Sequence, residues 1–125
     1  MQLIEINQTF SICKIANCSE IDFSDPFCFV GKTDEELSLV CSSQFVPKHP
    51  IEHSPGWRAF RVEGILDFSL TGILAKLSAV LADANIGIFA VSTYNTDYIL
   101  TKEEHFEAAL AALAAVGYQI KRCNE

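Results

Sequence analysis

A proline-rich segment near the middle of the chain limits what its 125 residues can form. Residues 46–56 hold three of the four prolines and show no sustained hydrophobic periodicity. Proline fixes its own φ and lacks a backbone N–H, so such a segment interrupts regular structure and predicts a linker. Each side of it is long enough for only a small folded unit. We therefore divide the chain into residues 1–47, a linker at 48–56, and residues 57–125.

The second half carries alternating strand and helix patterns. Residues 57–64 alternate as a strand does, and apolar residues from Leu70 to Ala84 recur at three- and four-residue steps, which predicts a helix with one buried face. Residues 86–94 and 97–101 are rich in β-branched and aromatic side chains and are separated by a short turn, which predicts a hairpin.

A second helix and a last strand complete this half. Thr101 followed by Glu104 matches a capping box, and an apolar stripe follows it up to Gly117. Residues 118–123 then predict a final strand. The order β-α-β-β-α-β is that of a ferredoxin-like α+β unit, an antiparallel sheet with both helices on one face.

The first half repeats part of this pattern. Residues 9–15 predict a strand, and residues 26–31 with 36–41 predict a hairpin. Aligned at an offset of 61, residues 28–45 lie over residues 89–106 with apolar and turn positions in phase, which indicates an internal repeat. The first copy lacks the crossover helix, so we expect two related units of which the first is degenerate.

The residues of the second half resemble a known family. The phrases WRAFRVEG (57–64), LDFSLTGIL (66–74) and IFAVSTYNTDYIL (88–100) are similar to those of small tandem ACT-domain proteins, a group related to the regulatory domains of aspartate kinases and to the CASTOR-type arginine sensors. The resemblance implies two ACT units per chain and a free amino acid bound between units. Asn95 departs from the family pattern, where an aspartate is more common.

The loop before the first helix is the first part of a candidate ligand site. At a helix N-terminus several N–H groups lack intrahelical partners and the helix dipole is positive, so an α-carboxylate can dock there. Gly72 leaves that approach open, although it can equally serve close packing of the helix on the sheet, and a side chain of the loop can simply cap the helix. The residues of this part are Asp67, Phe68, Ser69, Thr71, Gly72 and Ile73.

The tip of the predicted hairpin is the second part. Asp97 can pair with a cationic ligand side chain, and nearby carbonyls can accept from an α-ammonium, but Asn and Asp also occupy such turns for local backbone reasons. At the offset of 61, Glu36 is the counterpart of Asp97. The residues of this part are Ser92, Thr93, Tyr94, Asn95, Thr96 and Asp97.

Charge argues against nucleic acids and membrane surfaces as partners. The chain has 9 Lys and Arg against 16 Asp and Glu, and no basic run. Most of the acidic excess lies before residue 57, with 8 acidic and 3 basic residues, which points weakly to a cationic ligand such as lysine or arginine. No apolar stretch is long enough to span a membrane and no signal-peptide pattern begins the chain, so we expect a cytoplasmic protein.

Catalytic and metal motifs are weak. The five cysteines are irregularly spaced, which favours reduced thiols, and Cys13, Cys28 and Cys41 sit in apolar runs as core residues do. A zinc site would have to combine Cys41 with His49 and His53 across a proline-interrupted segment. We expect no metal, no cofactor and no enzyme activity.

The sequence thus favours a regulatory module that binds a small amino acid between ACT units, forms a homodimer and acts on a protein partner. Two alternatives stay open. One is an assembly module that binds no ligand and pairs through residues 86–94. The other is a small enzyme that uses cysteine and histidine, which needs a thiol and an imidazole within hydrogen-bonding distance.

Overall fold

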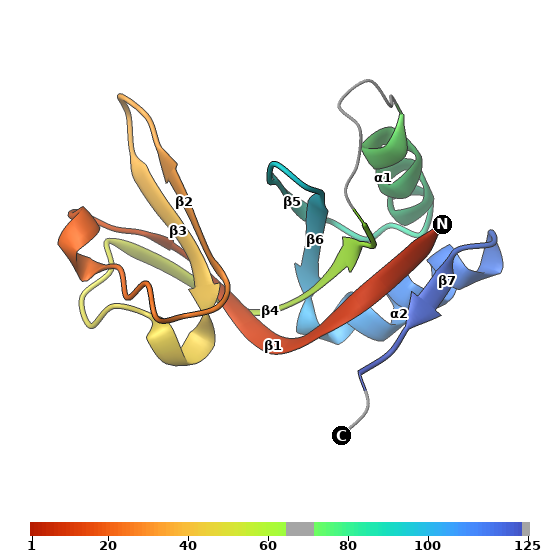
Figure 1. Ribbon diagram of the computed structural model, residues 1–125, viewed down its shortest axis with the longest axis horizontal. Coiled ribbons are helices and arrows are strands. Elements are labelled where there is room, and N and C mark those ends of the chain that lie inside the picture. The colour runs from red at the N-terminus through yellow and green to blue at the C-terminus, as the bar shows by residue number, and fades with distance from the viewer. Residues whose placement is uncertain (65–71, 124–125) are drawn as a thin grey trace. The chain divides into compact units, whose positions relative to one another are not determined.

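The computed structural model of the chain describes residues 1–64 and 72–123. These residues form two compact units, and two long strands contribute to both (Figure 1). Unit 1 combines Met1–Asn7 with Arg58–Glu125, and unit 2 is Gln8–Trp57. The shared strands are β1 (Gln2–Lys14) and β4 (Glu52–Val62).

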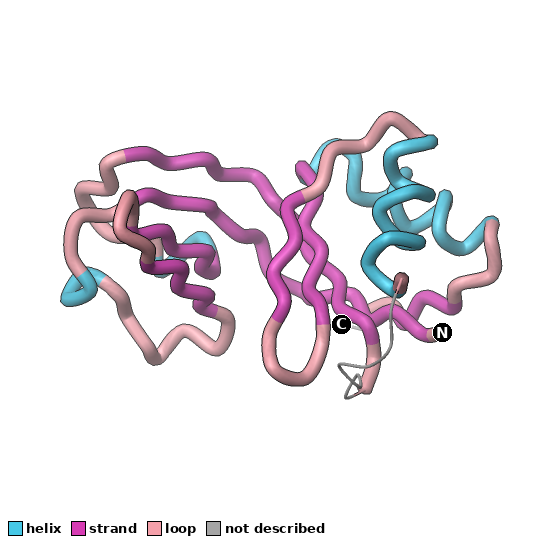
Figure 2. Tube along the Cα trace, turned by 90° about the horizontal axis from the view of Figure 1, so that it is seen from above, coloured by secondary structure: helices cyan, strands magenta, loops and turns pink. Residues whose placement is uncertain are grey.

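Unit 1 is an α+β unit with two helices packed on its strands (Figure 2). Its sheet runs in the order β7-β1-β4-β6-β5, antiparallel at β5 and β6 and parallel where β7 meets β1. The elements that follow β4 are α1 (Ile73–Asp83), β5 (Phe89–Ser92), β6 (Asp97–Lys102), α2 (Glu103–Ala115) and β7 (Gln119–Lys121). This β-α-β-β-α-β order confirms the sequence prediction.

The core of unit 1 lies between the helices and the sheet. Leu77 and Leu81 of α1 are fully buried against Phe60 and Val62 of β4, as the predicted stripe requires. The stripe of α2 is confirmed in full by four buried residues: Phe106, Ala109, Leu110 and Leu113. Gly117 follows the C-cap of α2 and has a positive φ of 106°, as expected of a glycine just after a helix.

The capping box predicted for α2 is wrong. The N-cap is Lys102, which makes no side-chain cap, because Thr101 is a fully buried residue of β6. Its hydroxyl donates to the Lys102 carbonyl at 3.2 Å instead. The N-cap position thus falls one residue after Thr101, on a lysine whose side chain has no acceptor for the first N–H groups of the helix.

Unit 2 has no α-helix among its described residues. Its sheet order is β2-β3-β1-β4, with β2 (Cys28–Lys32) and β3 (Leu37–Ser42) forming an antiparallel hairpin. Two single turns of 3₁₀ helix, η1 (Cys18–Glu20) and η2 (Ser43–Phe45), take the places where unit 1 has helices. The hairpin lies where the sequence predicted it.

The structure differs from the sequence prediction mainly at the boundaries of the predicted units and linker. Residues 1–7 form the first half of β1 and pack with residues 58–125, and Leu3 is fully buried in the core of unit 1. Residues 52–56, assigned above to the linker, are the start of β4. Pro55 is tolerated in this strand, and Gly56 takes a positive φ of 82°, which only glycine adopts readily. No helix in the described ranges is long and apolar enough to cross a membrane.

Candidate functional site

The tip of the β5–β6 hairpin is a four-residue turn, residues 93–96, which is stabilised by hydrogen bonds within the turn. The Thr93 N–H and the Thr93 hydroxyl both donate to the Thr96 carbonyl, each at 2.9 Å. At the last strand pair, the Ser92 hydroxyl donates to Oδ1 of Asp97 at 2.6 Å. The local turn chemistry considered for these residues is therefore present.

Thr96 connects this tip to the neighbouring strand. Its side chain is buried, and its hydroxyl donates to the Val62 carbonyl at 2.8 Å. Val62 is the last residue of β4, after which the chain leads toward the loop that precedes α1. Thr96 thus fixes the hairpin tip beside the end of β4, whereas Tyr94 and Asn95 are exposed at the apex and Tyr94 is 79% exposed.

The first part of the predicted site is only partly described. Asp67, Phe68, Ser69 and Thr71 lie outside the described residues. Gly72 is the N-cap of α1 at φ 83°, and its carbonyl accepts the first helical bond from the Lys76 N–H at 2.8 Å. A Cβ built on Gly72 meets no described atom within 4 Å. Close packing therefore gives no reason for glycine here, and the positive φ gives one.

A cavity of about 360 Å³ opens beside the start of α1. It contains two predicted site residues, Gly72 and Ile73, and none of the hairpin tip. The described part of the structure therefore does not unite the two predicted parts in one cavity. The remaining lining residues are Met1, Lys76, Val116, Gly117 and Tyr118.

Sequence reasoning missed these lining residues because they come from three separate places. Lys76 lies on the exposed side of α1, and Gly117 and Tyr118 follow α2. Gly117 was recognised only as a helix stop. Nothing in a linear pattern shows that the end of one helix lies beside the start of another, because that depends on how both helices pack on the sheet.

The two hairpins have matching turns, but at an offset of 60. The Thr33 N–H donates to the Glu36 carbonyl at 2.9 Å, as the Thr93 N–H does to Thr96. The residues that begin η2 and α2 match as well, since Ser42 has φ −59° and ψ 140° and Lys102 has φ −58° and ψ 144°. The offset of 61 is therefore wrong by one residue. The counterpart of Glu36 is Thr96, which removes the pairing of Glu36 with Asp97.

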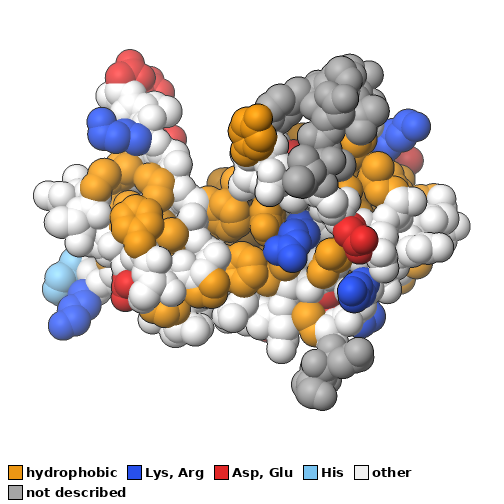
Figure 3. Space-filling view, in the orientation of Figure 1, with side chains coloured by type: hydrophobic (Ala, Val, Ile, Leu, Met, Phe, Trp, Pro, Cys, Tyr) orange, Lys and Arg blue, Asp and Glu red, His pale blue; other side chains and the backbone are white. Residues whose placement is uncertain are grey.

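Acidic side chains do gather at the other hairpin tip. Asp34, Glu35 and Glu36 are exposed at the turn between β2 and β3 (Figure 3). The Thr33 hydroxyl accepts from the N–H groups of Glu35 and Glu36 at 3.1 and 3.2 Å. Three of the eight acidic residues that precede residue 57 thus lie in a solvated turn of unit 2.

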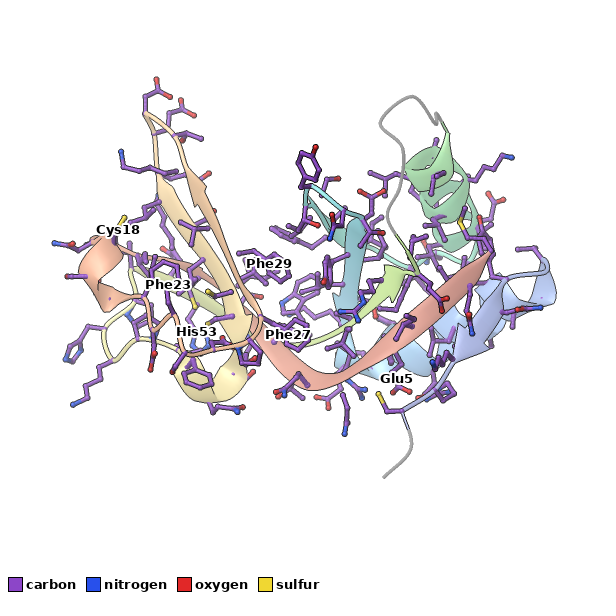
Figure 4. All side chains as sticks on the ribbon, in the orientation of Figure 1. Glu5, Cys18, Phe23, Phe27, Phe29 and His53 are labelled. Carbon is purple, nitrogen blue, oxygen red and sulfur yellow. The ribbon has the colours of Figure 1, made fainter. Side chains whose placement is uncertain are left out.

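A buried carboxylate lies elsewhere in unit 1, at Glu5 of β1 (Figure 4). Arg58 donates to Oε2 and Arg122 to Oε1, each at 2.8 Å, and the Cys123 N–H donates to Oε1 at 3.0 Å. Arg122 also makes two bonds to Glu107, at 3.0 and 2.6 Å. Burial raises the pKa of Glu5, but the bonds that Glu5 accepts from Arg122, Cys123 and Arg58 outweigh the effect of burial and leave the pKa below its ordinary value.

This Glu5 network joins the two ends of the chain. The Arg58 guanidinium also lies 4.7 Å from the centre of the Phe106 ring, a cation–π contact. Every charged group in the network has an opposite partner, which is typical of a structural network. Its members are spread over residues 5–122, so no local motif predicted it.

The histidines have ordinary partners. His53 Nε2 lies 3.2 Å from the Ser11 hydroxyl, and exposed His105 lies 3.8 Å from Glu104. Among the described residues, no group of three or more His, Cys, Asp or Glu side chains is placed to hold a metal ion. The zinc combination of Cys41, His49 and His53 is therefore not assembled.

Several solved structures are similar to this protein in sequence and fold. The protein is 29% identical to a protein from Agobacterium tumefaciens, with 99% of this chain and 94% of that chain covered at a TM-score of 0.87. A protein of unknown function from Vibrio cholerae, described as a possible transport protein, is 19% identical, with 89% and 85% covered at a TM-score of 0.74. The regulatory subunit of aspartate kinase from Thermus thermophilus is 12% identical, with 92% and 96% covered at a TM-score of 0.65.

At identities of 19% and 12%, the last two similarities show only that this protein shares their fold. No match was found among curated proteins. The ACT domain family matches residues 52–115, from the start of β4 to the end of α2. This match covers just over half of the chain, and it includes Gly72, Ile73 and the whole hairpin tip. The protein therefore belongs to the ACT domain family.

Proposed function

We propose that the protein is a non-catalytic regulatory module that binds a free amino acid at the start of α1. The observation that carries the proposal is the ACT family match over the segment that contains α1 and both parts of the predicted site. A protein that shares the fold is described as the regulatory subunit of aspartate kinase, which supports a regulatory role.

The α-carboxylate of the ligand docks at the N-terminus of α1. The first N–H groups of α1 have no intrahelical partners, and the positive φ of Gly72 turns the chain into the helix without a side chain in the way. Lys76, one turn into α1, adds a positive charge to the adjoining cavity. In this proposal Asp67, Phe68, Ser69 and Thr71 complete the carboxylate side of the site.

The hairpin tip recognises the other end of the ligand. The Ser92 hydroxyl donates to the Asp97 carboxylate at 2.6 Å, which fixes the position of that carboxylate. Such a group suits an ammonium or guanidinium, which favours lysine or arginine as ligand. Thr96 keeps the tip beside the end of β4 through its bond to Val62.

Regulation follows from linkage. A ligand that contacts two ACT-related units, within a chain or across a homodimer, stabilises one arrangement of them and so changes affinity for a protein partner. The matching turns of the two hairpins support a common origin of the units. The proposal includes a cytoplasmic location, where free amino acid levels are sensed.

Calorimetric titration with each of the twenty amino acids at millimolar concentration tests the proposal. We expect heat of binding for one or a few, with Asp97→Asn weakening a cationic ligand by about tenfold, the value of one charge-assisted hydrogen bond. Asp83→Asn is the matched control, because Asp83 is exposed at the far end of α1. Absence of binding by all twenty to the wild-type protein would refute the proposal.

An assembly module without ligand remains the second candidate. The observation that favours it is that β5 ends the strand order of unit 1, and an edge strand offers backbone groups to another chain. Ala90→Pro would remove one N–H from this edge. If light scattering shows a dimer that this substitution abolishes while no amino acid binds, the assembly function is favoured.

A further inference from the structure

Three cysteines lie on one face of the unit 2 sheet. Cys28 of β2 and Cys41 of β3 are directly opposite each other, and Cys13 of β1 faces Leu39, two residues from Cys41. All three thiols belong to one hydrophobic cluster. Cys41 and Cys13 are 1% and 2% exposed, whereas Cys28 is half-buried.

The strand pairing places Cys28 and Cys41 directly across from each other. The bond from the Thr33 N–H to the Glu36 carbonyl makes Thr33 and Glu36 a hydrogen-bonded pair. Hydrogen-bonded and non-hydrogen-bonded pairs alternate along an antiparallel ladder, and Cys28 with Cys41 lies five steps away, so it is a non-hydrogen-bonded pair. Such pairs have Cα atoms about 4.5 Å apart and their side chains approach closely.

That spacing is within the range of disulfides, whose Cα atoms are about 4.4–6.8 Å apart. Cys13 is a diagonal neighbour of Cys41, and diagonal Cα atoms are about 7–8 Å apart, beyond that range. The ladder therefore selects Cys28 over Cys13 as the partner of Cys41, although Cys13 and Cys41 also lie close enough for each thiol to affect the pKa of the other.

We propose that Cys28 and Cys41 form a reversible disulfide by exchange with a small-molecule disulfide such as glutathione disulfide. The Cys28 thiolate attacks one glutathione sulfur, forms a mixed disulfide and releases one glutathione thiolate. Cys41 then loses its proton and attacks the Cys28 sulfur, which closes the protein disulfide and releases the second glutathione. Two protein thiols are oxidised, one glutathione disulfide is reduced, and two glutathione thiols leave.

The disulfide would link the outer strand of unit 2, β2, covalently to β3. β2 ends the strand order of this sheet, and its ladder partner is β3. A covalent link between Cys28 and Cys41 restricts the unfolded hairpin and stabilises the folded one.

The surroundings of the thiols predict a slow reaction. Burial raises the pKa of Cys41 to about 12, with further contributions from Cys13 and Asp25. Burial and the nearby Asp25 and Asp22 carboxylates also raise the pKa of Cys28. Thiolate is the attacking species, so the rate of oxidation rises with pH across the neutral and alkaline range.

Incubation of the full chain in buffers of defined glutathione to glutathione disulfide ratio tests the proposal. We expect non-reducing peptide mass mapping to recover a peptide pair that joins Cys28 to Cys41. We also expect the melting temperature of the oxidised protein to rise by about 5 °C or more, and the rise to be reversed by excess glutathione.

Cys18 provides the matched control, because it is exposed on η1 and outside the thiol cluster (Figure 4). Cys18→Ser should leave the linked peptide and the rise in melting temperature unchanged, whereas Cys28→Ser should abolish both. Recovery of Cys28 only as its glutathione adduct, or of Cys41 linked to Cys13, would overturn the proposal. The mapping uses wild-type protein, so the result does not depend on whether a variant folds.

Discussion

At the scale of single residues, Glu5 shows how a charge is kept in the interior of this fold. Arg58 is 18% exposed at its side chain and Glu5 8%, so their ion pair is largely removed from water. Charges in such positions are costly unless each is paired and hydrogen-bonded, and Glu5 accepts from three donors. Loss of the carboxylate would leave the Arg58 charge buried without its partner.

Glu5→Gln is therefore expected to lower the free energy of unfolding at pH 7 by about 3 kcal/mol. This is at the low end for breaking a buried pair, since Arg122 is 46% exposed and screened by water. The lowered pKa of Glu5 means that its contribution is complete above the unfolded carboxyl pKa of about 4.3 and is lost as pH falls through the lower folded value.

Urea unfolding of both proteins from pH 7 to pH 3 measures this effect. The difference between wild type and Glu5→Gln should be constant above about pH 5 and should shrink below about pH 4. Glu104→Gln, an exposed site on α2, is the control and should follow wild type. A difference that stays the same down to pH 3 would show that the charge of Glu5 does not matter.

At the scale of elements, the β2–β3 hairpin depends on one carboxylate in the loop before it. Asp25 is 4% exposed and accepts from the Ser42 N–H at 2.8 Å, the Ser42 hydroxyl at 2.7 Å and the Phe27 N–H at 2.9 Å. These bonds join the start of the hairpin to the end of β3, where η2 begins.

Asp25→Ala is expected to destabilise the protein by about 3 kcal/mol, because the buried N–H and hydroxyl of Ser42 and the part-buried N–H of Phe27 lose their acceptor. Asp22→Ala is the matched control, since Asp22 is exposed and its carboxylate accepts from the N–H and hydroxyl of nearby Ser24. Hydrogen exchange should show faster opening of β2 and β3 in Asp25→Ala and little change in the control. Equal effects of the two substitutions would argue against the role given to Asp25.

At the scale of the whole molecule, the first seven residues complete the unit that the last sixty-eight residues begin. β1 lies between β7 and β4, with Gln2 opposite Gln119 and with the Glu63 N–H donating to the Gln2 carbonyl at 2.9 Å. Without this strand, β7 loses its ladder partner, β4 loses one of its two neighbours, and the core loses Leu3. Unit 1 is therefore made from both ends of the chain.

We expect a fragment of residues 58–125 to remain unfolded on its own. Counting from the bond between Glu63 and Gln2 along this antiparallel pair places Asn7 opposite Arg58 and makes Ile6 and Ala59 a hydrogen-bonded pair. An inserted Asn-Gly can therefore form a four-residue loop with Asn7 and Arg58, closed by that pair. A chain of residues 1–7, Asn-Gly and 58–125 should fold with a cooperative thermal transition by circular dichroism. A cooperative transition in the fragment that lacks residues 1–7 would contradict this account.

The sequence alone determined the elements and the family. Apolar spacing predicted both helices, and β-branched runs predicted both hairpins, because burying one face of a helix or strand imposes a period that local residues reveal. The phrases around Gly72 and the hairpin tip were enough to indicate an ACT domain. The turn offset was wrong by one residue, since only the hydrogen bonds of Thr33 and Thr93 define the register.

Tertiary structure alone decided which distant residues meet. It placed residues 1–7 beside β7, assembled the Glu5 network, brought the end of α2 to the start of α1, and paired Cys28 with Cys41. Local patterns report whether a residue is buried, and they do not report which partner buries it. That choice is made by the simultaneous packing of helices and strands on one sheet, which no single segment of the sequence contains.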